Sequence, residues 1–240
     1  MEVNVGLYIR QLLAGRDFAA GDYIAAQMAN FVYLVGDDEK KVCMVVDPAW
    51  DIPGIIEAAE REDMQLTGAL VTHYHPDHIG GNIFGHNIAG LAEFTELRPV
   101  KVHVNEIEGE GIKRVTGLSE SDLAKHQGGD DILIGDVKVR FLHTPGHTPG
   151  SQCFLAGDAL VSGDTLFIGG CGRVDLPGSD PQAMYHSLTQ VLAKLPEDTL
   201  LFPGHNYASK QVSTIGDEKN ENHYLRIKSL DDWMRLMGES

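Results

Sequence analysis

Three histidines and one aspartate stand within six consecutive positions of this sequence, in the stretch THYHPDHIGG at residues 72–81. The four side chains belong to His73, His75, Asp77 and His78. Imidazole nitrogen and carboxylate oxygen together suit zinc, iron or manganese, whereas an oxygen-only calcium or magnesium site would have no use for three histidines. The apolar run at residues 68–71 predicts a buried strand directly before the stretch, which argues against a chance His-rich surface loop. The pattern therefore predicts a metal site at the end of a strand.

Three more residues of the same chemical types follow later in the chain, each shortly after an apolar segment. They are His147, Asp164 and His205. The segments before them, at residues 137–142, 159–161 and 199–202, each predict a strand. Side chains at strand ends are held by rigid elements, so these three residues are further candidate ligands of a preorganised site.

The seven residues follow the order HxHxDH, a later His, a later Asp and a last His, and in this order the chain resembles the metallo-β-lactamase superfamily. The resemblance covers most of the chain. It implies an α/β fold of the αβ/βα sandwich type, in which two mixed β-sheets are flanked by helices. It also implies a division of the ligands: one metal ion is held by His73, His75 and His147, a second by Asp77, His78 and His205, and Asp164 bridges the two.

The chemistry of such a centre is hydrolysis. Two divalent ions about 3.5 to 4 Å apart can share a hydroxide, lower its pKa toward neutrality and polarise the carbonyl that it attacks. Asp164 and Asp77 are therefore the catalytic candidates. With two ions Asp77 is a ligand, whereas with one ion it orients the water or acts as general base. We expect two divalent ions as cofactors, zinc first, with iron and manganese as alternatives.

Two activities found elsewhere in the superfamily are disfavoured by this sequence. Zinc β-lactamases of the commonest kind resemble this layout but carry a cysteine at the position of Asp164, so antibiotic hydrolysis is not expected. Relatives that cut RNA or DNA need a phosphate-binding surface, yet this chain has 19 Lys plus Arg against 35 Asp plus Glu, a formal net charge of -16. A field of that sign repels nucleic acid, so no nucleic-acid partner is expected.

The glycine-rich loop at residues 167–178 resembles the loop of glyoxalase II, the hydroxyacylglutathione hydrolase, in part. In that branch a Gly-Cys-Gly-Lys element followed by a tyrosine helps to hold glutathione. Here Arg173 replaces the lysine and Asp175 stands where the tyrosine belongs. Glyoxalase II also completes its glutathione pocket with a longer helical tail, whereas residues 217–237 can form one or two helices at most. Glutathione is therefore only one candidate for the thiol carrier.

The same loop is also similar to that of persulfide dioxygenase, a mononuclear iron enzyme. Its iron ligands correspond to His73, His147 and Asp164, a two-histidine, one-carboxylate set with open positions for oxygen. Compact glyoxalase II-like hydrolases additionally resemble residues 176–181 and 213–219, and these longer matches favour a hydrolase. We therefore expect a metal-dependent hydrolase of a small-molecule thioester or ester, with persulfide dioxygenase and lactonase as alternatives.

Two residues outside the ligand set are predicted to bind the substrate. Arg173 offers a planar fork to a carboxylate, although an ion pair with Asp175 would explain it equally well. Tyr207, two residues beyond His205, either donates a hydrogen bond to the substrate or packs in the wall of the site. Near them, Cys171 is expected to be a packed, inert thiol, and His143 is a candidate hydrogen-bond donor behind a ligand.

The whole chain, residues 1–240, is expected to form a single domain, because an α/β domain of this length is ordinary. Residues 1–15 lack the apolar core and cleavage pattern of a signal peptide, and no apolar stretch is long enough to span a bilayer. The three cysteines have no CxxC spacing, which is consistent with a reducing compartment. We therefore expect a cytoplasmic enzyme without a membrane partner.

Strands and helices are expected to alternate along the chain, which favours the α/β class. Strands are predicted at residues 8–13, 30–35, 42–46, 68–72, 100–104, 132–134 and 137–142, and helices at residues 52–61, 88–96 and 106–116. Gly80 and Gly81 are expected to let a helix begin close to the metals. Residues 84–130 resemble an insertion that either covers the cleft as a lid or forms the contact of a homodimer.

Overall fold

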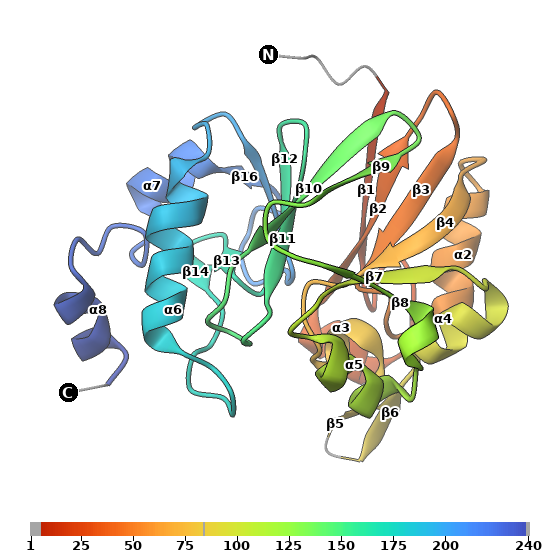
Figure 1. Ribbon diagram of the computed structural model, residues 1–240, viewed down its shortest axis with the longest axis horizontal. Helices are drawn as coiled ribbons and strands as arrows, with labels where there is room; N and C mark the ends of the chain where they lie inside the picture. The colour runs from red at the N-terminus through yellow and green to blue at the C-terminus, as the bar shows by residue number, and fades with distance from the viewer. Residues whose placement is uncertain (1–5, 84, 239–240) are drawn as a thin grey trace.

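Two six-stranded β-sheets lie against each other in the computed structural model, which describes residues 6–83 and 85–238 (Figure 1). Residues 1–5, 84 and 239–240 lie outside this description, so the expectation of no signal peptide falls partly outside the described residues. The first sheet has the strand order β1-β2-β3-β4-β7-β8, and the second has the order β16-β15-β12-β11-β10-β9. Both sheets contain parallel and antiparallel pairs. With helices on their outer faces, they form the predicted αβ/βα sandwich.

The first half of the chain builds the first sheet and its helices. Its strands are β1 (Leu7–Leu13), β2 (Phe31–Asp37), β3 (Val42–Val46), β4 (Gln65–Leu70), β7 (Lys101–Asn105) and β8 (Leu123–His126). Its helices are α1 (Tyr23–Met28), α2 (Ile52–Glu60), α3 (Pro76–Ile79), α4 (Leu91–Leu97) and α5 (Gly109–Thr116), with a 3-10 turn at Glu120–Asp122. A small hairpin of β5 (Gly81–Ile83) and β6 (His86–Ile88) stands between α3 and α4.

The second half of the chain builds the second sheet. Its strands are β9 (Asp131–Ile134), β10 (Val137–His143), β11 (Gln152–Ala156), β12 (Ala159–Gly163), β15 (Leu200–Pro203) and β16 (Ser213–Thr214). A short hairpin of β13 (Leu166–Phe167) and β14 (Gly170–Cys171) follows β12. The helices are α6 (Pro181–His186), continued by a π turn at Ser187–Val191 and a 3-10 turn at Leu192–Lys194, and then α7 (Ile215–Glu221) and α8 (Leu230–Leu236).

One core lies between the two sheets, and a larger one lies between the first sheet and its helices. Strand β10 alternates, so that Val137, Val139 and Phe141 are buried while the lysine and arginine between them are exposed. These buried side chains pack against Phe31 and Tyr33 of β2 in the other sheet. All seven residues of β2 are buried, because this strand is paired on both sides and both of its faces are covered. The inward faces of both sheets thus hold the sandwich together by burial of apolar surface.

The strand directions bring several loops to one edge of the sandwich. Strands β3, β4 and β7 run parallel, as do β12 and β15. Strand β10 runs the same way as β12, because two antiparallel pairings through β11 separate them. In the second sheet, the loops after β10, β12 and β15 therefore start at the same edge. The loop after β4 lies against this edge from the first sheet. Backbone hydrogen bonds join the sheets there, from Gln152 N to Thr72 O at 3.0 Å and from Phe31 N to Gly204 O at 2.8 Å.

The predicted strands and helices are confirmed to within a few residues, and the tail forms two helices as expected. The prediction that a helix begins at Gly80 is wrong. The helix begins at Pro76, whose fixed φ suits the first helical position, and it ends at Gly80, which has a φ of +83°. A Cβ on Gly80 would also lie 2.6 Å from the Gly90 Cα, so the chain crosses itself too closely there for any other residue.

The segment at residues 84–130 is not a separate lid. Apart from Phe84, which lies outside the described residues, it supplies β6, α4, β7, α5 and β8, and both β7 and β8 are hydrogen-bonded strands of the first sheet. Whether this segment also contacts a second copy of the chain stays a prediction. Among the helices that the structure describes, none is long and apolar enough to cross a membrane.

Candidate metal centre

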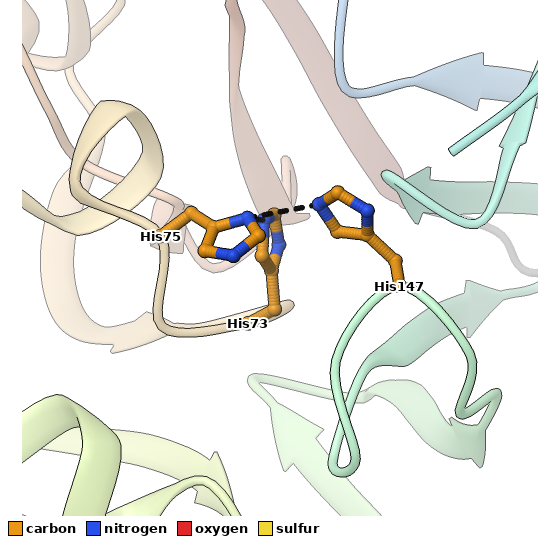
Figure 2. Close-up of side chains that lie close together, drawn as sticks. All are labelled: His73, His75 and His147. Atoms are coloured by element: carbon orange, nitrogen blue, oxygen red, sulfur yellow. Dashed lines mark hydrogen bonds between the residues drawn. The ribbon is translucent and has the colours of Figure 1, made fainter. Parts of the chain in front are cut away.

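The first candidate ligand set consists of three histidines whose rings point toward one another from the loops after β4 and β10 (Figure 2). His75 Nδ1 lies 3.1 Å from His73 Nε2 and 2.9 Å from His147 Nε2. Around one tetrahedral zinc with Zn–N bonds of about 2.0 to 2.1 Å, neighbouring nitrogens stand roughly 3.3 Å apart. The three nitrogens therefore fit a single ion.

The second candidate set consists of Asp77, His78 and His205, all of them buried. His78 Nε2 lies 3.2 Å from His205 Nε2. Asp77 Oδ2 lies 3.4 Å from the first of these nitrogens and 3.5 Å from the second. Asp77 and His78 stand on the short helix α3, whereas His205 follows β15, so the set joins the two halves of the sandwich.

Asp164, which follows β12, lies between the two sets. Its Oδ2 is 3.3 Å from His205 Nε2 and 3.6 Å from His147 Nε2, and its Oδ1 is 3.2 Å from His78 Nε2. Among the described residues Oδ1 accepts no hydrogen bond, although it is buried. A buried carboxylate oxygen without a donor fits a metal ligand, because an ion would satisfy it. Gly204 leaves room for this carboxylate, since a Cβ there would lie 2.4 Å from Oδ1.

Four histidines of the cluster donate a hydrogen bond from the ring nitrogen that faces away from it. His147 Nδ1 donates to the Arg173 carbonyl and His205 Nδ1 donates to the Met28 carbonyl, each at 2.8 Å. His78 Nδ1 likewise donates to Asp47, and His73 Nδ1 donates to Thr72. An Nδ1 that carries the proton leaves a lone pair on Nε2, so four lone pairs are aimed into the cluster.

Asp47 supports both ligand sets and was not predicted from the sequence. Its Oδ2 accepts from His78 Nδ1 at 3.0 Å and from Thr72 Oγ1 at 2.6 Å, while its Oδ1 accepts from Thr72 N at 2.8 Å. Because Thr72 Oγ1 donates its proton to Asp47, it accepts from His73 Nδ1, which lies at 3.0 Å. Asp47 also lies close enough to these two histidines to form a third ligand group with them, but its hydrogen bonds account for that proximity.

Asn30, directly before β2, is a second contact that the sequence did not predict. Its Nδ2 donates to Asp77 Oδ2 at 3.0 Å and lies 3.3 Å from His78 Nε2. From the other side, the Trp50 ring donates to the Asp77 carbonyl at 3.1 Å. A carboxylate held from both its side chain and its backbone keeps a fixed direction toward the second set.

The surroundings shift the pKa values of the histidines in opposite directions in the two ligand sets. Burial, followed by the nearby His78, lowers the pKa of His73 well below its usual range, and burial with His147 lowers the pKa of His75 to about 4. Burial raises the pKa of Asp164, but the imidazoles of His205 and His78 outweigh it and hold that pKa well below its usual range. For His78 and His205, burial lowers the pKa, but the Asp164 carboxylate outweighs burial and raises the pKa of both rings above the usual value. Metal binding at the second set therefore releases protons, because an imidazole binds a metal only in its neutral form.

The Arg173 guanidinium forms an ion pair with Asp175, which was the alternative to substrate binding in the sequence analysis. Its Nε and one terminal nitrogen each donate to the Asp175 carboxylate at 2.8 Å, and both side chains are exposed. Its backbone has a separate role, because the Arg173 carbonyl accepts the hydrogen bond that orients His147. The predicted contact of the guanidinium with substrate stays a prediction.

Tyr207 lies beside the second ligand set. Its ring stacks on the His205 ring with centroids 4.7 Å apart and an interplanar angle of 9°, and it meets the Phe167 ring edge-on at 5.6 Å. The residue is still 60% exposed, so one face remains open to solvent. The ring therefore packs in the wall of the centre and is also available to a bound molecule, although its role in binding stays a prediction.

Two neighbouring residues do not join the ligand sets. Burial raises the pKa of the Cys171 thiol to about 12, which makes it an unreactive thiol. His143 Nε2 faces the Pro149 carbonyl at 3.0 Å, so this side chain braces the turn that carries His147. Among the described residues, His143 forms no hydrogen bond to a ligand ring, so it is not the donor behind a ligand that the sequence suggested.

Comparison with known proteins agrees with the geometry. Residues 27–205 match the family model described as the Metallo-beta-lactamase superfamily. The probable hydroxyacylglutathione hydrolase glo2 of Schizosaccharomyces pombe is 37% identical over 246 residues, which cover 88% of this chain and 88% of that protein. The mitochondrial persulfide dioxygenase ETHE1 of Homo sapiens is 30% identical over 237 residues, which cover 95% of this chain and 86% of that protein.

The crystal structure of ETHE1 from Myxococcus xanthus superposes with a TM-score of 0.77 at 28% identity, covering 96% of this chain and 90% of that chain. The family model spans most of the chain, from before β2 to the last candidate ligand, His205. This chain therefore belongs to the metallo-β-lactamase superfamily, and its histidine and aspartate clusters are typical of the binuclear metal site of that superfamily.

Proposed function

We propose that this protein is a metal-dependent hydrolase that cleaves a thioester or ester, similar to hydroxyacylglutathione hydrolase. The observation that carries the proposal is the position of Asp164, whose Oδ2 lies 3.6 Å from His147 Nε2 and 3.3 Å from His205 Nε2. One carboxylate can therefore serve both ligand sets, as two ions that act on one substrate require. The 37% identity to the probable hydroxyacylglutathione hydrolase glo2 supports the same activity.

Two divalent ions, when bound, supply a hydroxide nucleophile at neutral pH and stabilise the oxyanion that develops on the carbonyl. The residues of this chain hold that chemistry in place. His147 and His205 are each fixed by a backbone carbonyl, so their rings do not turn when a substrate enters. Burial raises the pKa of Asp77, but the opposing effect of His78 and His205 is larger and lowers it, so Asp77 stays ionised, as a ligand of the second ion must be.

Zinc is the ion that we propose first for both positions. Five imidazoles and two carboxylates form a mixed nitrogen and oxygen donor set, and the nitrogen separations of 2.9 and 3.1 Å in the first set suit tetrahedral coordination. Iron and manganese accept the same donors and are the alternatives.

A mononuclear iron persulfide dioxygenase is the second candidate function. The human enzyme of that name is 30% identical and covers 95% of this chain. Its iron would use His73, His147 and Asp164. His147 Nε2 lies 3.6 Å from Asp164 Oδ2. A lactonase is a third candidate, because a lactone presents the same electrophilic carbonyl to the same nucleophile.

The substrate is proposed to be a small molecule. The Arg173 guanidinium is engaged by Asp175, so a carboxylate on the thiol carrier would compete with that ion pair. A formal net charge of -16 disfavours nucleic acid as substrate or partner. We also propose that the protein is cytoplasmic and that it forms a homodimer through residues 84–130.

The test measures metal content and two activities on one preparation. Protein purified without added metal is analysed for zinc, iron and manganese, and is then assayed for hydrolysis of a glutathione thioester and for oxygen uptake with glutathione persulfide. About two ions per chain with thioester turnover supports the hydrolase. One iron per chain with persulfide-dependent oxygen uptake and no thioester turnover would sink it.

A further inference from the structure

Glu108 is a buried glutamate that the proposed chemistry does not use. It stands directly before α5, and only 1% of it is exposed. Its Oε2 accepts from Tyr74 N at 2.8 Å. Its Oε1 accepts from Thr148 Oγ1 at 2.8 Å and from Gly150 N at 2.7 Å. One carboxylate therefore binds two loops that are more than 70 residues apart in the sequence.

These two loops carry the first ligand set. Tyr74 stands between His73 and His75, and Thr148 directly follows His147. Glu108 thus contacts the neighbours of the ligands from behind, while the ligand atoms His75 Nδ1 and His147 Nε2 face each other at 2.9 Å. Among the described residues, the Glu108 carboxylate has no hydrogen bond to a direct sequence neighbour of His205, and those that it makes are to Tyr74, Thr148 and Gly150.

The surrounding glycines are needed for this arrangement. A Cβ on Gly150 would lie 2.6 Å from Glu108 Cγ and 2.7 Å from its Oε1. Likewise, a Cβ on Gly111 of α5 would lie 2.9 Å from the Tyr74 ring. The start of α5 is therefore pressed against both ligand loops, and the space around the carboxylate is closed on two sides.

Three neutral donors satisfy the Glu108 carboxylate. Burial raises its pKa, whereas the hydrogen bonds from Thr148, Gly150 and Tyr74 favour the charged form. A carboxylate has only acceptors, so it can face donors from both loops at once. An amide of the same size cannot, because one of its two ends is itself a donor.

We propose that Glu108 is a positioning residue that sets the separation of His75 and His147, and thereby the affinity of the first ligand set for its metal ion. Ligands must be held within about 0.5 Å of their working geometry, so a tie between their two loops acts directly on metal binding. The inference rests on the metal centre of the proposed function and is independent of the substrate.

The variant Glu108→Gln tests the tie at nearly constant volume. If the glutamine oxygen takes the place of Oε1, it keeps the contacts with Thr148 and Gly150, but its NH₂ then meets the Tyr74 N–H, donor against donor. The link between the two loops is then lost. The matched control is Glu110→Gln on the same helix, since the Glu110 side chain is 83% exposed and pairs with Lys113.

The affinity for zinc is measured by competition with a chromophoric chelator in two backgrounds. In His205→Ala the first set remains complete, and we expect Glu108→Gln to weaken zinc binding about 10-fold or more, as loss of a supporting contact does elsewhere. In His147→Ala only the second set remains complete, and we expect a change of less than about 2-fold. Glu110→Gln should leave both affinities as they are in the parent backgrounds.

Equal weakening in both backgrounds would assign Glu108 a general structural role and overturn the inference, as would no weakening in either. Thr148→Val removes one of the same hydrogen bonds and is measured alongside, with a smaller expected loss of roughly 2- to 10-fold confined to the His205→Ala background. Failure of the proposed centre is distinguishable, because the chain without any substitution would then bind no zinc tightly.

Discussion

The Asp47 carboxylate accepts a hydrogen bond from His78 Nδ1 at 3.0 Å and fixes the direction of that ring in the second ligand set. Both side chains are buried. Through Thr72, the same carboxylate also reaches His73 of the first set. The two metal positions are therefore joined behind the ligands by Asp47 and in front of them by Asp164. The two sets therefore share these two carboxylates, whereas Glu108 contacts the loops of the first set alone.

Asp47→Asn is expected to weaken metal binding about 10- to 100-fold, the usual range for loss of such a contact. If the amide nitrogen faces Thr72 N, two donors meet; if it faces His78, the proton of that ring must move to Nε2, which can then no longer bind a metal. Zinc stoichiometry and affinity provide the measurement. Asp38→Asn, an exposed residue paired with Lys41, is the control. Unchanged affinity in Asp47→Asn would contradict the role of Asp47.

The two aspartates of the centre are expected to respond differently to substitution. Asp164→Ala should abolish activity whether one or two ions are bound, because its carboxylate lies within 3.6 Å of ligand atoms from both sets. Asp77→Ala should lower the metal content from two ions to one only if the centre is dinuclear. Metal analysis and turnover of the two variants provide the measurement. Near-normal turnover in Asp164→Ala would show that the centre is wrongly assigned.

The candidate ligands could be found from the sequence because their signal is local. The motif at residues 72–81 has a fixed spacing, and His147, Asp164 and His205 each follow an apolar run that predicts a strand. Parallel strands then bring these loops to one edge of the sandwich. The αβ/βα sandwich itself was implied by resemblance, since alternating strands and helices alone indicate only the α/β class.

The residues that support the ligands have no such signal. Asp47 acts on His78, 31 positions away, and Glu108 acts on Thr148, 40 positions away, so their roles depend on packing that no local pattern encodes. Asp47 does follow the predicted strand at residues 42–46, which is the one feature that could have suggested it. The helix start is a different case, because its signal is local: Pro76 suits the first helical position, and Gly80 ends the helix that the two glycines were predicted to begin.

Tyr207→Phe should separate packing from substrate binding. The phenyl ring keeps the stacking on His205 at 4.7 Å but loses the hydroxyl, so we expect an unchanged metal content and a KM raised about 3- to 10-fold, the range for one hydrogen bond to a substrate. Tyr207→Ala removes the ring as well and should also reduce kcat. Steady-state kinetics on the thioester provide the measurement, with Tyr23→Phe, 73% exposed on α1, as the control. A KM unaffected by Tyr207→Phe would leave Tyr207 as wall packing alone.

Glu218 of α7 is expected to hold the loop that follows Asp164. This buried carboxylate accepts from Gly169 N at 2.8 Å and from Asn222 Nδ2 at 2.9 Å with Oε2, and from Ser213 Oγ at 2.6 Å with Oε1. Glu218→Ala removes the acceptor of Gly169 N and Ser213 Oγ, whereas Asn222 Nδ2 keeps the Phe167 and Gly170 carbonyls. We therefore expect a loss of about 1 to 3 kcal/mol in unfolding free energy and a raised KM with metal content unchanged.

Glu218→Gln should restore most of that loss, because the Ser213 hydroxyl can turn to accept from the new amide while the remaining oxygen keeps Gly169 and Asn222. Chemical denaturation and steady-state kinetics on both variants provide the measurement, with the exposed Glu221→Ala on the same helix as the control. Equal losses in Glu218→Ala and Glu218→Gln would mean that the charge of Glu218, rather than its acceptor geometry, stabilises the loop beside the metal centre.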